Sequence, residues 1–265
     1  MDFSTETVTD IKHWSDSLFS FRTSRPESLR FQSGEFLMLG LMTEDTAAGV
    51  QKPLMRAYSI ASPAWHEELE FYSIKVSDGA LTSRLQHIKP GDHVLLKPKP
   101  VGTLLVDALL PGERLWLFAT GTGIAPFASI LRDPETYQKF EQIIVTHTCR
   151  KRVELDYGKQ LMQQLQHDEI LLELIGSEHL SKLVYYPKTT REGRASTGRI
   201  TTLLKNRMVF DDLGLDGLFP HTDRAMVCGS KGFNREITTL LEQYGLEEGS
   251  RSDPRQFVLE RAFVD

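Results

Sequence analysis

The distribution of apolar residues divides the chain into two parts with different periodicities. Up to about residue 106, short apolar runs at 34–42, 54–62, 69–76 and 92–100 are separated by clusters of Gly, Pro, Asp and Ser. Runs of this length with such punctuation predict β-strands. One segment, 81–88, reads as a helix and is closed by Pro90 and Gly91. Several strands at short spacing favour a small antiparallel barrel.

From about residue 114 the pattern changes to strands that alternate with helices. Strands are predicted at 114–121, 141–149, 182–190 and 224–229, and helices at 124–140, 154–166 and 234–245. Pro134 predicts a break in the first of these helices. Such alternation implies a parallel sheet with helices on both faces. We therefore expect a two-domain β + α/β protein, with an antiparallel β-barrel at 1–106, a linker near 106–113 and a parallel α/β domain at 107–265.

Composition narrows the range of functions. The 265 residues are 40% hydrophobic and 25% charged, and the net charge of −5 argues against nucleic acid as a main partner. The first ten residues contain no apolar signal segment, and no apolar run approaches the roughly 20 residues of a membrane helix. The only cysteines are Cys149 and Cys228, which excludes a four-cysteine iron–sulfur cluster and makes a disulfide an unfavoured alternative. We expect a cytoplasmic protein with no metal site and no membrane contact.

The stretch RAYSIAS at 56–62 places Arg56 and Tyr58 on the same side of a predicted strand. This pair could be an ordinary rim pair with a half-buried ring. It could also be a phosphate clamp beside a flat stacking surface.

A glycine-rich turn, FATGTGIAP at 118–126, lies where the first strand of the second half leads into a helix. Gly121 and Gly123 allow the backbone to approach a pyrophosphate, and Pro126 can stand at the start of the helix. Pro126 occupies the place of the third glycine in the usual dinucleotide fingerprint, so the turn differs from the standard motif.

The end of the next strand is basic. Arg150 is followed by Lys151 and Arg152, at the place where NAD enzymes carry an acid for the ribose 2′-hydroxyl. Two loop arginines, Arg191 and Arg199, could converge on the same anion. This arrangement favours a 2′-phosphate, and hence NADP over NAD, with an ordinary solvated basic loop as the alternative.

Together these motifs give the chain a resemblance to a known family. RAYS at 56–59, GxxT at 79–82, GTGxAP at 121–126, CG at 228–229 and the ending ERAFVD resemble the ferredoxin–NADP+ reductase superfamily over essentially the whole chain. The chain is most similar to the bacterial ferredoxin/flavodoxin–NADP+ reductases of that superfamily.

The resemblance implies a non-covalently bound FAD in the first domain. Arg56 would meet the flavin pyrophosphate, Tyr58 would stack on the ring system, and Ser59 would lie near its N5 atom. Thr82 and Ser83 would bind the remaining phosphate charge, with a plain helix N-cap as a compatible role for Thr82. The full set implied to bind or adjoin FAD is Arg56, Ala57, Tyr58, Ser59, Ser73, Ile74, Lys75, Val76, Gly79, Leu81, Thr82, Ser83, Thr122 and Phe263.

The resemblance also implies NADP(H) at the second domain and a tail that returns to the flavin. The NADP(H) set is Gly121, Gly123, Arg150, Arg191, Arg199, Cys228 and Gly229, with Cys228 beside the nicotinamide or, alternatively, a small buried residue. Ala262 would cover the ring opposite Tyr58, and Phe263 would pack near the adenine or anchor the last strand. The implied catalytic residues are Tyr58, Ser59, Cys228 and Ala262.

The implied activity is electron exchange between NADP(H) and a separate one-electron carrier protein, ferredoxin or flavodoxin, by a monomer. A local basic face toward that carrier could include Lys97, Lys99, Arg22, Arg25 and Arg30. The alternatives are an NAD(P)H-dependent free-flavin reductase, a flavin-dependent sensor or carrier, and a purely structural protein. Retention of the flavin and its reduction by NADPH separate these functions.

Overall fold

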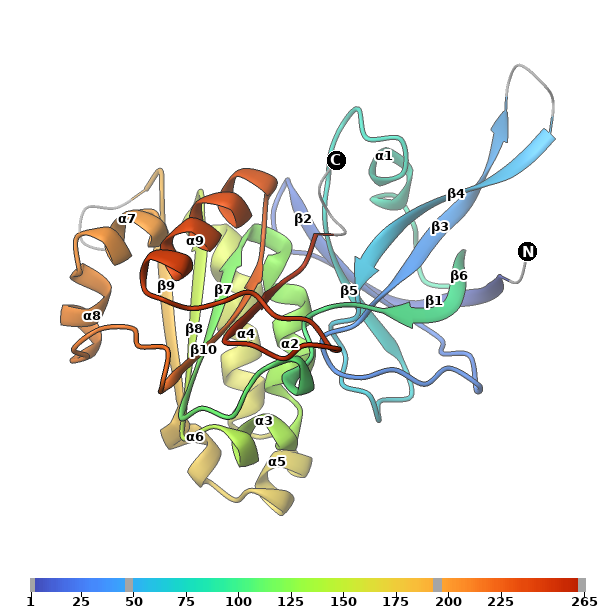
Figure 1. Cartoon of the computed structure of the whole chain (residues 1–265). Coiled ribbons are helices and arrows are strands. Elements are labelled where there is room, and N and C mark those ends of the chain that lie inside the picture. Colours follow the sequence, from blue (N-terminus) through green and yellow to red (C-terminus); the bar gives the residue numbers. More distant parts are fainter. Residues whose placement is uncertain (1–2, 46–49, 193–196, 262–265) are drawn as a thin grey trace.

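A computed structural model describes residues 3–45, 50–192 and 197–261. These residues form two sheets that share no strand (Figure 1). The first sheet contains six antiparallel strands in the order β4-β3-β6-β1-β2-β5. Their bounds are β1 Ser4–His13, β2 Leu18–Thr23, β3 Phe36–Asp45, β4 Val50–Ser59, β5 Leu69–Ile74 and β6 His93–Val101.

The first sheet confirms the predicted antiparallel half, although the barrel is open. Among the described residues no ladder joins the edge strands β4 and β5. Instead, a backbone hydrogen bond of 2.8 Å from Ala61 N to Glu70 O links the two segments just beyond the end of β4. Figure 1 shows β3 and β4 as a long hairpin that extends away from the body of the molecule. The one helix of this half among the described residues, α1 (Thr82–Leu85), is shorter than predicted.

Two strands of the first sheet were not predicted. β1 has the sequence STETVTDIKH, in which only Glu6 and Val8 are buried, so its apolar signal is weak. It is nevertheless central, because it pairs with both β2 and β6. β2 is buried along almost its whole length, since Phe19 and Phe21 enter the core of this half.

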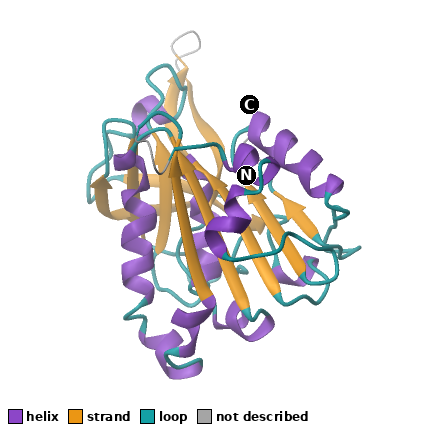
Figure 2. Cartoon of the chain, turned by 90° about the vertical axis from the view of Figure 1, so that its left-hand side faces the viewer, coloured by secondary structure: helices purple, strands orange, loops and turns teal. Residues whose placement is uncertain are grey.

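The second sheet is parallel, with the order β11-β10-β7-β8-β9, which confirms the predicted α/β half. Its strands are β7 Arg114–Thr120, β8 Gln142–Cys149, β9 Leu183–Thr189, β10 Asp223–Cys228 and β11 Phe257–Leu259. Figure 2 shows the helices on both sides of the strands. One face carries α2 Ala125–Leu131, α3 Pro134–Lys139, α4 Asp156–Leu165 and α5 Glu169–Leu174, and the other carries α7 Ile200–Lys205, α8 Met208–Leu213 and α9 Lys231–Gln243. The remaining helical segments are α6 Glu178–Lys182 and the 3₁₀ turns Val106–Ala108, Gly121–Ile124 and Arg152–Leu155.

The predicted helix at 124–140 is broken before Pro134, as expected. α2 ends at Leu131 and α3 begins at Pro134, with the side chain of Asp133 capping α3 by accepting from Glu135 N at 3.0 Å. The short helices α5 to α8 were not predicted, because each presents only one to four buried residues and therefore no extended period.

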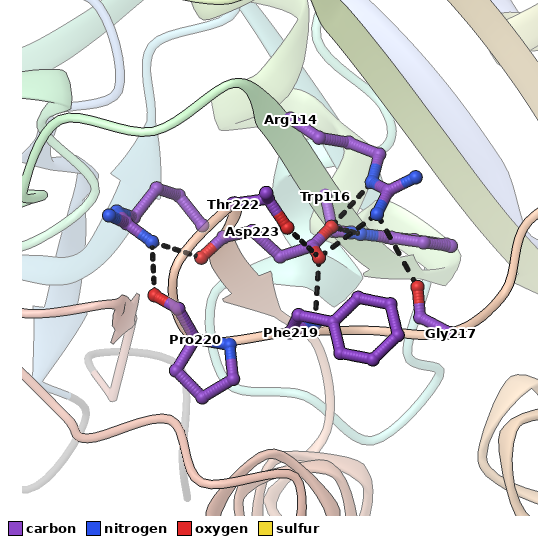
Figure 3. A network of polar contacts seen from close by, with 8 residues as sticks. Arg114, Trp116, Gly217, Phe219, Pro220, Thr222 and Asp223 are labelled. Atoms are coloured by element: carbon purple, nitrogen blue, oxygen red, sulfur yellow. Dashed lines mark hydrogen bonds and ion pairs between the residues drawn. The ribbon is translucent and has the colours of Figure 1, made fainter.

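The start of β7 and the start of β10 are joined by a buried carboxylate. Asp223 accepts hydrogen bonds from the Arg114 guanidinium, from Trp116 Nε1 at 2.7 Å and from Phe219 N at 2.7 Å (Figure 3). The network lies at the edge of the sheet where these parallel strands begin. The strands end at the opposite edge of the sheet.

Polar contacts also join the two halves. Arg132, at the end of α2, donates to Ala61 O at 2.8 Å and pairs with Glu70 of β5 at 3.4 Å. Tyr157 of α4 donates to the same carboxylate at 3.0 Å and stacks on Tyr72 with ring centroids 4.1 Å apart. These buried contacts fix one sheet against the other.

Candidate functional site

A cleft of about 960 Å³ opens between the end of β4 in the first sheet and the carboxyl ends of β7, β8 and β10 in the second. Ligands of open α/β sheets bind at this edge. Most of the residues that the sequence singled out line this cleft: Arg56, Ala57, Tyr58, Ser59, Ile74, Val76, Gly79, Leu81, Thr82, Gly121, Thr122, Gly123, Arg150, Arg199, Cys228 and Gly229.

The RAYS stretch ends β4 at the wall of the cleft. Arg56 is exposed, and its guanidinium donates to its neighbour's carbonyl, Met55 O, at 2.9 Å. Tyr58 is 8% exposed and lies edge-on to Phe71, while its hydroxyl is 3.2 Å from Ser73 Oγ. Burial raises the pKa of Tyr58, so its phenol is neutral. Ser73 is therefore a partner of Tyr58 and does not itself line the cleft.

Part of the segment 74–83, which follows β5 and includes the GxxT motif, lines the same cleft. Ile74 and Val76 are both 44% exposed although they are apolar, and both line the cleft. Exposed apolar side chains beside polar groups are typical of a surface that a flat ligand covers.

Two residues of this segment that were predicted to adjoin FAD do not line the cleft, and the predicted N-cap role of Thr82 is wrong. Lys75 donates to Ser15 O at 2.9 Å, and Ser83 does not line the cleft. Thr82 is not the N-cap of α1: that position is Leu81, and the Thr82 hydroxyl donates to Val76 O at 3.2 Å. A Cβ on Gly79 would lie 2.3 Å from Thr82 Oγ1, so any larger residue would displace the Thr82 side chain.

The backbone of the glycine-rich turn packs directly against the backbone at the end of β10. Gly121 has φ +54°, and nothing lies within 4 Å of where its Cβ would be. A Cβ on Gly123 would lie 2.1 Å from Cys228 O, and a Cβ on Gly229 would lie 2.2 Å from Thr120 Oγ1. The turn is therefore open toward the cleft and closely packed on its other side, as a phosphate-binding turn requires.

Both cysteines are free, buried and at this edge of the sheet. Burial raises the pKa of Cys228, with a further contribution from the carboxylate of Glu260, and burial raises the pKa of Cys149 to about 12. Both thiols are neutral near pH 7. Glu260 was not predicted; it is 5% exposed and lies 3.4 Å from Thr103 N, which connects the end of the chain to the first half.

Only two of the three arginines that were predicted to bind NADP(H) line the cleft. Arg150 and Arg199 line the cleft. Arg191 does not, although its backbone N–H donates to Arg150 O at 3.0 Å. Ala262 and Phe263 lie outside the described residues.

The three arginines of the proposed basic face each have a hydrogen-bond or ion-pair partner within the protein. Arg25 donates to Ala64 O and His66 O, each at 2.7 Å, and Arg30 donates to Glu27 O at 2.6 Å. Arg22 pairs with Glu68 at 3.6 Å. Lys97 and Lys99 are exposed on β6.

Two buried hydroxyls on the cleft wall were missed. Tyr72 Oη and Thr148 Oγ1 have no hydrogen-bond partner in the described part of the chain, and both residues line the cleft. Buried polar groups are nearly always paired, so such hydroxyls indicate a ligand or water that completes them. Neither position stood out in the sequence, because Tyr and Thr are ordinary strand residues.

The start of α9 also lines the cleft, through Ser230 and Phe233. Ser230 caps the helix by accepting from Phe233 N at 3.4 Å, and this serine before a helical run was a readable signal. The open glycine turn, the exposed apolar wall and the unpaired hydroxyls together fit a flavin and a dinucleotide phosphate.

The described residues contain no cluster of His, Cys, Asp and Glu that could hold a metal ion. None of the helices in that part of the chain is long and apolar enough to cross a membrane.

Comparisons with known proteins agree with this geometry. The oxidoreductase FAD-binding domain family matches residues 6–105, and the oxidoreductase NAD-binding domain family matches residues 117–239. The chain is thus an oxidoreductase with a flavin-binding and a nicotinamide-binding half. The predicted cofactors, FAD and NADP(H), are confirmed at the level of these families and of the solved structure described next.

Whole-chain similarities define the family more narrowly. The chain is 60% identical over 259 residues to a flavodoxin/ferredoxin–NADP reductase of Rhodobacter capsulatus, covering 98% of this chain and 93% of the relative. It is 46% identical over 262 residues to a ferredoxin–NADP reductase of Pseudomonas aeruginosa, covering 98% of each. A solved ferredoxin NADP+ reductase from Neisseria gonorrhoeae with bound FAD and NADP superposes with a TM-score of 0.85 at 30% identity, covering 98% of this chain and 99% of that one. The chain belongs to the ferredoxin/flavodoxin–NADP reductase family, as its motifs suggested.

Proposed function

We propose that this protein exchanges electrons between NADP(H) and a one-electron carrier protein, ferredoxin or flavodoxin, through bound FAD. The observation that carries the proposal is the single cleft into which both halves project their motifs. Tyr58 and Ser59 line it from β4, and Cys228 and Gly229 line it from the end of β10. A flavin and a nicotinamide held by these two groups would face each other. Residues 1–106 would bind FAD and residues 107–265 would bind NADP(H).

The chain's own residues would bind and orient both groups. The chemistry that FAD supplies when bound is to take an electron pair from NADPH and release the electrons singly. Tyr58 presents a buried, neutral ring whose hydroxyl is fixed by Ser73 at 3.2 Å. Cys228 presents a neutral thiol at the other wall, so neither residue is ionised near pH 7. Arg56 supplies an exposed positive charge for a phosphate.

Arg150 and Arg199 support a preference for NADP(H). Both line the cleft, where a 2′-phosphate would add charge-assisted hydrogen bonds. One acid, Glu154, also lines the cleft, and its Oε2 accepts from the backbone N–H groups of Arg150 at 2.7 Å and Lys151 at 3.0 Å.

The test begins with purified protein that has been desalted extensively. We expect it to keep a stoichiometric yellow flavin, identified as FAD after denaturation, and to be bleached by NADPH under anaerobic conditions much faster than by equimolar NADH. Subsequent addition of oxidised flavodoxin or ferredoxin should restore the colour. Loss of the flavin on desalting, with turnover restored by free FMN or FAD, would show the alternative, a free-flavin reductase.

We further propose that the protein acts as a monomer in the cytoplasm. One chain supplies both walls of the cleft, and both cysteines are free. Light scattering of the FAD-loaded protein should give a mass near 30.1 kDa. A concentration-independent dimer would contradict this expectation.

A further inference from the structure

A buried histidine joins the glycine-rich turn to the neighbouring strands. His147 of β8 is fully buried, and its Nε2 lies 3.0 Å from Gly121 O. Its other ring nitrogen, Nδ1, lies 3.0 Å from the hydroxyl of Tyr185 on β9. The imidazole thus bridges two strands and the turn, although the residue itself does not line the cleft.

The protons of this bridge can be assigned from the acceptors. Gly121 O can only accept, so Nε2 must carry the proton, and in a neutral ring Nδ1 must then accept from the Tyr185 hydroxyl. Burial lowers the pKa of His147 to about 4, which keeps the ring neutral near pH 7. Cys149 Sγ, 3.2 Å from Nε2, can donate to Glu154 O at 3.5 Å, so it does not compete for this assignment.

Helix α4 packs closely over the His147–Tyr185 pair. Gly158 lies inside α4, where glycine costs about 1 kcal/mol relative to alanine. A Cβ at this position would lie 2.4 Å from Tyr185 Oη and 2.8 Å from His147 Nδ1. Glycine at 158 is therefore required for the helix to pack over the bridge.

The bridge determines which way one peptide group of the turn faces. In a trans peptide the carbonyl and the following N–H point in opposite directions. Because Gly121 O faces His147, the N–H of Thr122 faces away from it, toward the cleft that both Gly121 and Thr122 line. Gly121 is in the left-handed region at φ +54°, a conformation that exposes consecutive N–H groups to an anion. No side-chain cap holds the start of this turn at Thr120.

We propose that His147, oriented by Tyr185, is a positioning residue that aims the Gly121–Thr122 peptide at the pyrophosphate of NADP(H). This inference rests on the proposed function, since it assigns a cause to the geometry of the same site. The distal 2′-phosphate, near Arg150 and Arg199, would be unaffected by the orientation of this peptide.

The test compares two ligands by calorimetry on the oxidised, FAD-loaded protein. NADP+ carries both the pyrophosphate and the 2′-phosphate, whereas adenosine 2′-monophosphate carries only the latter. In His147→Leu, which has no donor, we expect the dissociation constant of NADP+ to rise about 10-fold, equivalent to 1.4 kcal/mol. The constant for adenosine 2′-monophosphate should stay within about 2-fold, because its contacts do not include the turn. His147→Gln retains an N–H donor and should restore most of the NADP+ affinity.

A second variant and a control keep the result decisive. Tyr185→Phe retains the ring and removes the hydroxyl, so it should weaken NADP+ by roughly 3-fold even if His147→Leu fails to fold. Asp223→Asn disrupts a buried network at the opposite edge of the sheet and should leave both constants unchanged while lowering stability.

The possible outcomes separate the inference from the proposed function. Unchanged NADP+ binding in the folded variants, or equal losses for both ligands, would overturn the role of His147 and leave the proposed function standing. Failure of the wild-type protein to bind NADP+ would overturn both.

Discussion

The buried carboxylate of Asp223 allows a quantitative test of what holds the second half together. Its side chain is fully buried, and the paired Arg114 side chain is 15% exposed. One carboxylate oxygen accepts from Arg114 Nε at 2.5 Å and Trp116 Nε1 at 2.7 Å. The other accepts from Arg114 Nη2 at 3.0 Å, Phe219 N at 2.7 Å and Thr222 Oγ1 at 3.0 Å.

The substitution Asp223→Asn keeps the shape and removes the charge. Whichever oxygen becomes the amide nitrogen, it then faces at least two donors, and the guanidinium loses its counter-charge. Breaking a buried ion pair from one side costs about 3–5 kcal/mol, and two lost hydrogen bonds to charged groups give a similar figure. We expect the free energy of unfolding to fall by about that amount.

The assay is urea denaturation of the FAD-loaded protein followed by circular dichroism, with a lower midpoint and an unchanged slope. The matched control is Asp253→Asn, whose side chain is 67% exposed and pairs with Arg255 at 3.2 Å. It should change stability by no more than about 0.5 kcal/mol. NADP+ affinity should be unchanged in both variants, because Asp223 lies five residues, or roughly 16 Å, along β10 from Cys228. A loss below about 1 kcal/mol, or an equal loss in the control, would refute this account of the network.

Three further predictions concern the cleft and its support. Arg56→Ala should weaken FAD retention by roughly 1.5–3 kcal/mol, measured by equilibrium dialysis, whereas Arg30→Ala should not; full retention would show that Arg56 is not the phosphate clamp. Arg150→Ala should raise the NADPH Michaelis constant several-fold and leave NADH turnover unchanged, because NADH lacks the 2′-phosphate, and equal effects on both would assign Arg150 to another contact. The pKa of His147 is lowered to about 4 in the folded state, so the unfolded chain binds the extra proton first as pH falls below about 6.5. Stability should therefore fall by roughly 3 kcal/mol between pH 6.5 and 4 relative to His147→Gln, and parallel curves for the two proteins would disprove the shift.

The strand–helix alternation of the second half could be predicted from the sequence, although not its shortest elements. β7, β8 and β10 are apolar runs of six to eight residues, and the Gly-rich, Pro-containing boundary that follows β7 predicts a strand–turn–helix unit. β11 was not predicted, because it has only three residues. The spacing of the motifs is sufficient to predict the glycine turn and the RAYS stretch as binding segments. These motifs can be recognised in the sequence because each depends on local backbone requirements that single residues satisfy.

The sequence did not reveal features that depend on partners distant in the chain. β1 is mostly polar, and it is a strand because β2 and β6 pair with it on both sides. The contacts of Arg25 could not be predicted either, because the carbonyls of Ala64 and His66 that it binds lie about forty residues further along the chain.

The site itself was decided by tertiary structure. Gly123 meets Cys228 O because two parallel strands end at one edge, more than a hundred residues apart in sequence. Tyr72 of β5 and Thr148 of β8 line the same cleft from different sheets, and their buried hydroxyls have no partner among the described residues. His147 is an unremarkable strand residue in the sequence, and burial against Tyr185 and Gly121 is what fixes its tautomer. Local propensity specifies elements, but the direction of a peptide or the pairing of a buried proton is set by neighbours that only the folded chain brings together.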